Sequence, residues 1–397
     1  MRGPTPGRFW RYVTERLGLR PYLQAPGDGR RQPLIPARAL LRALLLGQLL
    51  RETSFHGLEA LVRSSARRAL GIPRRFGDDA LAYFTERLDP APTRTALLSI
   101  LRRAKRGKAF DNSPFIGLAL DGCTTGRCRR RGCELCRPIR TRGGEVVGYC
   151  HHLVLISVVG TGLSLPFDVE PYGPGEGELS AAKRLLTRAV HGLGRRFADY
   201  LVLDGEYAGA PFLHLAEQLG LGLVVRLKAN LPTLLGEAQQ RLGYDPAPHR
   251  FRDGEDRVEC WDRDDFQPWE GLGWPSVRVI FYRQYKPNGT VVEAYWLTNF
   301  STRQLGARSL YRLAKSRWEI ENQGFNEAKN RHGFQHICHH HSNALRVVWL
   351  LTLLAMTMER LYRLRYLHRG NHRRRSAAEL CRLLWLRLSA PAIFDSS

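Results

Sequence analysis

The chain has 397 residues, which is enough to bury a substantial core and more than a single small module needs. Lysine and arginine number 61 against 37 acidic residues, and the net charge of +24 favours a polyanionic partner unless a biased base composition of the gene has inflated the arginine content. The longest apolar stretch, Val347 to Met358, is well short of the ~20 residues that span a bilayer, so no membrane partner is expected.

The cysteines are expected to be reduced. The first residues lack the apolar run of a secretion signal, so the sequence favours a cytoplasmic, nucleoid-associated protein in a reducing compartment. Five of the eight cysteines nevertheless fall between Cys123 and Cys150. This crowding requires a local explanation other than disulfide bonds.

An all-helical N-terminal domain is expected over residues 1–110. Leu41, Leu44 and Leu45 lie at helical spacing, and a second helix is expected over 54–70. We interpret this domain as DNA-binding, and a solvated basic face on a helical bundle is the alternative. Its basic residues include Arg63, Arg67, Arg68, Arg74, Arg75, Arg102, Arg103, Lys105, Arg106 and Lys108.

After Pro114 the pattern changes to short apolar runs separated by turns. Strands that alternate with helices predict an α/β layer, in which the ends of neighbouring strands gather ligands. The turn Gly160-Thr161-Gly162 indicates an antiparallel hairpin. Strands are expected at 115–121, 146–159, 163–169, 200–204 and 222–228, and helices at 178–193 and 211–219.

Residues 232–302 are expected to form a β-rich insertion in this layer. Asn288-Gly289 lies between two apolar runs and is a strong hairpin signal. Trp296 in the second run is either a core residue or a platform for an extruded base. Helices are expected again over 309–331, 343–365 and 377–388, with a basic segment at 368–375.

Three acidic residues stand in contexts that could bring them together. Asp121 and Asp204 each end an apolar strand, although either alone could be a turn residue or a helix cap. Arg317 and Glu321 are four residues apart on one helix face, whereas Glu319 is expected to point to solvent. Carboxylates at the ends of two strands and on one helix can hold a pair of divalent cations against a phosphodiester.

The segments Leu120-Asp-Gly122, Leu203-Asp-Gly-Glu206 and Arg317-Trp-Glu-Ile-Glu-Asn322 resemble the motifs of a known family. They are similar to those of the DDE transposases of bacterial insertion sequences, in the ribonuclease-H-like, retroviral-integrase superfamily. The resemblance covers roughly residues 78–360. It implies an α/β fold, with a ribonuclease-H-like mixed sheet and flanking helices, interrupted by a β-rich insertion and preceded by an all-helical N-terminal domain.

The same resemblance implies a metal-binding catalytic triad of Asp121, Asp204 and Glu321, with two Mg²⁺ or Mn²⁺ ions. The implied activity is cut-and-paste transposition, in which a homodimer binds terminal inverted repeats, nicks the DNA and transfers the strand to target DNA, through a hairpin-ended intermediate. Alternatives are a metal-dependent nuclease or resolvase on the same fold and a non-catalytic DNA-binding descendant. The residues expected to contact DNA are Tyr311, Arg317, Lys329, Arg129, Arg130 and Arg131, although Tyr311 and Lys329 do not fall at the family's spacing.

The predicted division of the chain follows from these assignments. The helical DNA-binding domain is residues 1–110, and the catalytic domain is 111–231 together with 303–345. The catalytic part contains a Cys-rich excursion at 122–152. The β-rich insertion is 232–302, and a helical region closes the chain at 346–397.

The Cys-rich excursion could hold a structural zinc ion. Cys133 and Cys136 have the Cys-x-x-Cys spacing of a zinc knuckle, and His151 lies on the strand that returns. Cys128 or Cys150 is expected to be the fourth ligand. The alternative is an arginine-rich DNA-contacting loop without metal. The histidines between His336 and His341 are interpreted as a helix-to-helix turn, because adjacent histidines on a short loop cannot all face one ion.

Overall fold

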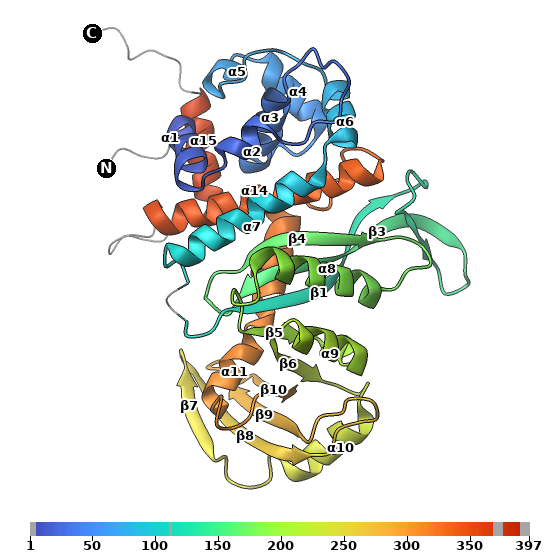
Figure 1. Ribbon diagram of the computed structural model, residues 1–397, viewed down its shortest axis with the longest axis vertical. Helices are drawn as coiled ribbons and strands as arrows, with labels where there is room; N and C mark the ends of the chain where they lie inside the picture. The colour runs from blue at the N-terminus through green and yellow to red at the C-terminus, as the bar shows by residue number, and fades with distance from the viewer. Residues whose placement is uncertain (1–4, 111–112, 368–375, 390–397) are drawn as a thin grey trace.

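The computed structural model describes residues 5–110, 113–367 and 376–389. A mixed ten-stranded sheet lies between helices, and a layer of helices covers one end of the molecule (Figure 1). The predicted α/β class with a helical N-terminal region is therefore confirmed. The basic segment 368–375 lies outside the described residues.

The N-terminal region is helical, as predicted. The predicted helix at 54–70 is divided in two at Ser64 and Ser65, and its first turn is capped by Ser54, whose hydroxyl accepts a hydrogen bond of 2.9 Å from the Gly57 amide. The elements are α1 (Pro6–Arg11), η1 (Tyr12–Arg16), α2 (Arg20–Gln24), α3 (Ala37–Leu50), α4 (Phe55–Arg63), α5 (Ala66–Ala69), α6 (Asp78–Arg87) and α7 (Pro90–Arg106).

Two C-terminal helices complete this helical layer. Helix α14 (Ser342–Tyr362) packs against α3, α6, α7 and a strand of the sheet, and it continues into η4 (Arg363–Leu367). Every residue of α14 from Val347 onward is buried, as expected for the apolar run 347–358. The charged residues Glu359 and Arg360 that follow this run are buried beside His332 and Glu327. Helix α15 (Ala377–Ser389) packs against α1 and α3 (Figure 1). Among the helices of the described residues, none has the length and apolar character needed to cross a membrane.

The sheet is built around the long strand β3, which pairs with β1 along one side and with β2 and β4 along the other. The order across the sheet is β2-β3-β1-β5-β6-β10-β9-β8-β7, and β4 pairs with β3. The strands are β1 (Gly117–Cys128), β2 (Arg137–Arg140), β3 (Val146–Val159), β4 (Leu165–Tyr172), β5 (Tyr200–Leu203), β6 (Gly222–Leu227), β7 (His249–Asp253), β8 (Asp256–Phe266), β9 (Val277–Tyr285) and β10 (Val291–Thr298).

The β-rich segment 232–302 extends this sheet. It begins with helix α10 (Pro232–Arg241), and its strand β10 pairs antiparallel with β6, so that β7 to β10 continue the sheet at the lower end of Figure 1. The predicted hairpin turn at Asn288-Gly289 joins β9 and β10, and Gly289 has a φ of 81°, which favours glycine. Trp296 is fully buried and therefore belongs to the core rather than to a base-stacking surface.

Helices cover both faces of the sheet. Helix α8 (Glu178–Leu193) packs on β1, β3 and β4, and α9 (Ala210–Gln218) packs on β6. The chain then returns behind β1 in Figure 1 as a nearly continuous helical segment, whose π-helical part η3 packs on β1, β3 and β4 from the opposite face. The parts of this segment are α11 (Ala307–Lys315), α12 (Arg317–Glu319), η3 (Ile320–Phe325) and α13 (Asn326–Arg331).

Candidate active site

The register of two parallel strands brings the two aspartates together. In β1 and β5, Leu118 lies opposite Leu201 and Ala119 lies opposite Val202. Asp121 follows Ala119 by two residues and Asp204 follows Val202 by two residues. The two aspartates therefore lie side by side at the same height along the two strands. Neighbouring strands are ~4.8 Å apart, so their side chains are positioned to share one site. Asp121 is within β1 rather than at its end, because β1 stays paired with β3 beyond it.

Asp204 begins the short 3₁₀ helix η2 (Gly205–Tyr207) directly after β5. Its side chain accepts a hydrogen bond of 2.7 Å from the Gly205 amide, which is the usual role of an aspartate at a helix start. Lys228 Nζ lies 2.6 and 2.8 Å from the two carboxylate oxygens. Burial raises the pKa of Asp204, but these hydrogen bonds outweigh it and hold that pKa below the ordinary value.

Arg317 joins all three predicted acids. Its Nη1 lies 2.8 Å from Glu321 Oε1, and its Nη2 lies 3.2 Å from Asp121 Oδ2 and 3.6 Å from Asp204 Oδ2. The Arg317 side chain is 10% exposed, so the contacts are shielded from bulk water. Asp121, Asp204 and Glu321, which are far apart in the sequence, thus surround one positive charge.

Burial dominates the electrostatics of Asp121. It raises the pKa of this carboxyl to about 6, and the nearby charges of Glu321 and Asp204 act in the same direction, whereas Arg317 opposes them. Burial alone would lower the pKa of Arg317, but its acidic neighbours raise it above the ordinary value. Three negative charges at this partly buried site repel one another and are poorly solvated, and this electrostatic cost favours the binding of a cation.

The three carboxylates fit the divalent ions that the sequence motifs imply. Oxygen ligands from carboxylates are those that Mg²⁺ and Mn²⁺ prefer. Because one guanidinium nitrogen contacts both aspartates, their Oδ2 atoms are at most about 7 Å apart, a span compatible with ions held about 4 Å from each other. Glu321 is 42% exposed and therefore leaves the site open on one side.

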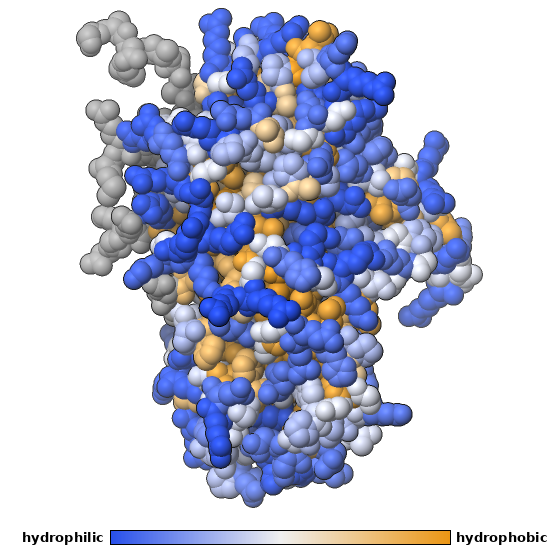
Figure 2. All heavy atoms as spheres, in the orientation of Figure 1, coloured by the Kyte–Doolittle hydropathy of each residue, from blue (hydrophilic) through white to orange (hydrophobic). Residues whose placement is uncertain are grey.

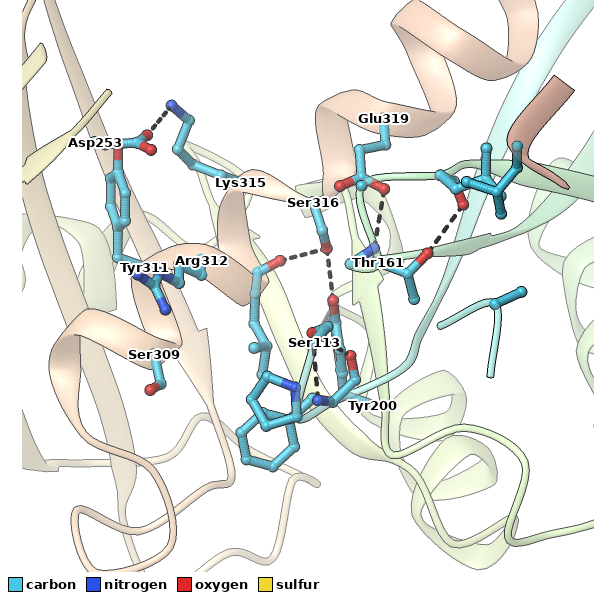
Figure 3. Close-up of a pocket in the computed structure, with 18 residues that line it drawn as sticks. Ser113, Thr161, Tyr200, Asp253, Ser309, Tyr311, Arg312, Lys315, Ser316 and Glu319 are labelled. Atoms are coloured by element: carbon cyan, nitrogen blue, oxygen red, sulfur yellow. Dashed lines mark hydrogen bonds and ion pairs between the residues drawn. The ribbon is translucent and has the colours of Figure 1, made fainter. Parts of the chain in front are cut away.

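Glu319 does not point to solvent, and the expectation that it would is wrong. Its Oε2 accepts a hydrogen bond of 2.9 Å from the Gly160 amide, and burial raises its pKa to about 7. The side chain lines a cavity of about 930 Å³ together with Thr161, Ser316 and Tyr200 (Figure 3). The reason is that the turn between β3 and β4 covers the helix face that carries Glu319.

Glu178 is a fourth carboxylate near the site that sequence reasoning did not select. It accepts hydrogen bonds of 2.5 Å from the Tyr207 hydroxyl and 3.1 Å from the Tyr172 hydroxyl, and its charge contributes to the raised pKa of Asp121. A side chain on Gly122 would place its Cβ 2.1 Å from the Glu178 carboxylate. In the sequence, Gly122 is the feature that could have indicated this neighbour, since a glycine directly after a site aspartate leaves room for another side chain to approach.

Two of the residues expected to contact DNA are turned inward. Tyr311 is 1% exposed and donates a hydrogen bond of 2.9 Å to Asp253 Oδ2, and Arg317 is committed to the three acids. The polar groups of both side chains are thus already paired within the protein. Lys329 is half-buried, with its Nζ 5.7 Å from the centre of the Phe325 ring. Arg129, Arg130 and Arg131 are exposed at the turn between β1 and β2, in the hairpin that projects to the right in Figures 1 and 2.

The Cys-rich excursion brings three of the four expected zinc ligands together. Cys133, Cys136 and His151 cluster, whereas Cys128 is not among the side chains whose ligand atoms all lie within 4.8 Å of one another. Its thiol neighbours that of Cys136 and lies 3.8 Å from the Tyr149 carbonyl. The alternative fourth ligand, Cys150, is 3.4 Å from His152 instead.

The fourth side chain of this cluster is His340. The segment that carries it connects α13 to α14, as the predicted helix-to-helix turn requires. One histidine of this turn, His340, nevertheless joins Cys133, Cys136 and His151, which the interpretation as a turn did not anticipate.

A mixed sheet that presents two aspartates on neighbouring strands, with a glutamate from a helix packed on the sheet, defines the DDE class of transposases. The family model described as "Transposase DDE domain" matches residues 140–358, and the chain belongs to this family. The matched range contains Asp204 and Glu321, whereas Asp121 lies before it.

One solved structure is similar over most of its length. It is titled "Cryo-EM structure of piggyBac transposase synaptic complex with hairpin DNA", and it is 11% identical, with 98% of this chain and 83% of that chain covered and a TM-score of 0.46. The comparison with curated proteins gave no match.

Proposed function

We propose that this transposase cuts DNA at the terminal inverted repeats of an insertion sequence and joins the freed ends to target DNA. The observation that carries the proposal is the convergence of Asp121, Asp204 and Glu321 on the Arg317 guanidinium. Those carboxylates would hold two Mg²⁺ or Mn²⁺ ions. When bound, the ions would activate the attacking hydroxyl and stabilise the leaving oxygen of an in-line displacement.

The protein's own side chains prepare this site. Lys228 holds Asp204 through both carboxylate oxygens, and Arg317 keeps the three carboxylates together against their mutual repulsion. Glu178 lies against Gly122, the residue after Asp121, and is itself held by two tyrosine hydroxyls. Groups that are already fixed lose little entropy when substrate and metal arrive, which favours a productive geometry.

DNA is the proposed partner on grounds of charge. The net charge of +24 includes exposed arginines on the helical layer and on the hairpin between β1 and β3. We assign DNA binding to residues 1–110 and to Arg129, Arg130 and Arg131, with Lys329 close to the reacting strand. Cleavage and joining are assigned to residues 111–231 and 303–345, supported by 232–302 and 346–397. A homodimer that pairs two ends in the cytoplasm, at the nucleoid, completes the proposal.

The test is a nicking assay on labelled DNA that carries the inverted repeats flanking the gene. Asp121→Asn, Asp204→Asn and Glu321→Gln keep side-chain size and remove charge, so each should lower Mg²⁺-dependent nicking by about 100-fold or more while DNA binding is retained. Glu319→Gln is the matched control on the same helical segment and should stay active. Full activity of any of the three variants would remove that residue from the triad.

The same substrates separate transposition from simple cleavage. DNA ends that have been cut beforehand should be joined to a target plasmid by the wild-type protein and not by Glu321→Gln. Nicking without any joining would favour a nuclease or resolvase instead. Binding without nicking, in the wild-type protein, would favour a non-catalytic descendant.

A further inference from the structure

Four potential metal ligands, three from the projecting hairpin and one from a segment far along the chain, meet at one point. Cys133 and Cys136 lie in the turn between β1 and β2, His151 lies on β3, and His340 lies between α13 and α14. One ligand atom from each of the four lies within 4.8 Å of every other. Two thiols and two imidazoles are a complete donor set for a structural zinc ion.

The distances within the cluster match the edges of a zinc tetrahedron. Cys133 Sγ and Cys136 Sγ are 3.6 Å apart, and His151 Nε2 lies 3.2 and 3.4 Å from them. With Zn–S bonds of about 2.3 Å and Zn–N bonds of about 2.0 Å, a regular tetrahedron has S–S edges of about 3.8 Å and S–N edges of about 3.5 Å. The three atoms are therefore spaced as ligands of one ion.

The backbone around the cluster allows the four ligand side chains to come close to one another. The Cys136 amide donates to the Cys133 carbonyl at 3.2 Å, which closes the turn that points both thiols the same way. A Cβ on Gly132 would lie 2.3 Å from His340 Nδ1, so this position has to be glycine for the histidine to come in. His151, which is fully buried, lies on the protein side of the cluster, and His340, which is exposed, lies on its solvent side.

Further contacts hold the two distant segments in register. Thr125 Oγ1 donates a hydrogen bond of 2.8 Å to the Phe334 carbonyl, and the Ile337 side chain fills the space left by Gly126. The segment that carries His340 thus already lies along β1. A metal ion bound at the cluster would add coordination bonds between this segment and the hairpin.

We infer that Cys133, Cys136, His151 and His340 bind one structural Zn²⁺ ion, which ties the arginine-bearing hairpin to the segment that follows the third acid. The ion replaces contacts that a short, largely exposed hairpin cannot supply by apolar burial. Its loss frees the hairpin, and with it Arg129, Arg130 and Arg131, from a fixed position relative to Glu321. Zinc thereby sets where the hairpin meets DNA, and the reaction chemistry stays with the carboxylates.

The first test is the metal content of the full-length protein purified without chelators. One zinc per chain is expected, and substitution by Co²⁺ should give the visible absorption of a tetrahedral site with thiolate and imidazole ligands. A wild-type protein that contains no zinc and takes up no Co²⁺ when soluble and folded would overturn the inference. This outcome would leave the nicking activity, and so the proposed function, untouched.

Matched variants identify the ligands. His340→Ala should lower zinc retention during dialysis against a chelator by at least about tenfold, whereas His336→Ala, an exposed histidine of the same segment outside the cluster, should behave as wild type. Cys128→Ser should also retain zinc. If Cys128→Ser loses the metal and His340→Ala keeps it, the ligand set is wrong.

The DNA readout separates a hairpin anchor from a general fold support. His340→Ala should weaken binding to the inverted repeat several-fold while its thermal unfolding in Mg²⁺ buffer shows the same cooperative transition. Added Zn²⁺ should restore binding in the wild-type protein after chelation and should not restore it in Cys133→Ser. Unchanged binding after complete zinc removal would refute the positioning role.

Discussion

Glu319→Gln should stabilise the protein at alkaline pH and leave its stability unchanged in acid. The Glu319 carboxyl has no ion pair among the described residues and accepts one hydrogen bond, from the Gly160 amide, which glutamine can also accept. Burial raises its pKa from 4.5 to about 7. Because the folded protein holds this proton to higher pH than the unfolded chain does, stability is fully present below pH 4.5 and is lost as the pH rises toward 7.

The size of the effect follows from that interval. At about 1.4 kcal/mol for each pH unit, the ionised carboxyl costs at most about 3 kcal/mol above pH 7, and screening by solvent at the open side of the cavity would reduce this to about 2 kcal/mol. Urea unfolding of both proteins, followed by tryptophan fluorescence at pH 5 and pH 8, measures it. Other groups titrate equally in the two proteins, so the difference in unfolding free energy isolates Glu319. A difference that does not grow between pH 5 and pH 8 would refute the reasoning.

Two further outcomes concern the acids themselves. The affinity of the wild-type protein for Mn²⁺, measured by calorimetry, should be constant above pH 7 and should fall about tenfold per pH unit below pH 6. The reason is that Asp121, whose pKa is raised to about 6, becomes protonated in that range. The affinity of Asp121→Asn should lack this pH dependence. Arg317→Met should destabilise the metal-free protein at pH 8 by about 3 kcal/mol, since three carboxylates lose their shared cation, and added Mg²⁺ should restore part of the loss. Equal stability of Arg317→Met and wild type in chelator would show that the guanidinium does not offset the repulsion.

Local patterns predicted much of the fold. The helix at 178–193 has the ends that its apolar spacing and flanking glycines indicate, and the hairpin at Asn288-Gly289 forms because few other turns suit that dipeptide. The individual strands over 249–266 are not predicted from the sequence, because charged residues such as Asp262 and Asp264 interrupt the alternation of apolar and polar residues. Helix α10 was missed because its short apolar content resembles a loop.

The candidate site, like the fold, could be predicted only where short local motifs determine it. Asp121, Asp204 and Glu321 could be selected because each sits in a short motif, and the strand register then brings the two aspartates level. Helical periodicity showed that Glu319 faces away from Glu321, but not that the turn at Gly160 would cover that face. Only the folded chain reveals such coverage.

His340 was inaccessible to motif reasoning for a related reason. It is separated from His151 by most of the catalytic region, and its spacing to its neighbouring histidines matches no ligand pattern. The contact depends on how the segment after α13 folds back along β1. Pairings of this kind follow from tertiary packing and leave no trace in local sequence.

The pairing of β10 with β6 limits how the chain can be shortened. Strand β6 is bonded to β5 on one side and to β10 on the other, so residues 232–302 cover what would otherwise be a bare edge of the sheet. Deleting them would leave a row of unpaired amides and carbonyls one strand away from Asp204. Such an edge templates association between chains. A transposase trimmed to its motif-bearing segments would therefore aggregate instead of giving a smaller version of the same enzyme.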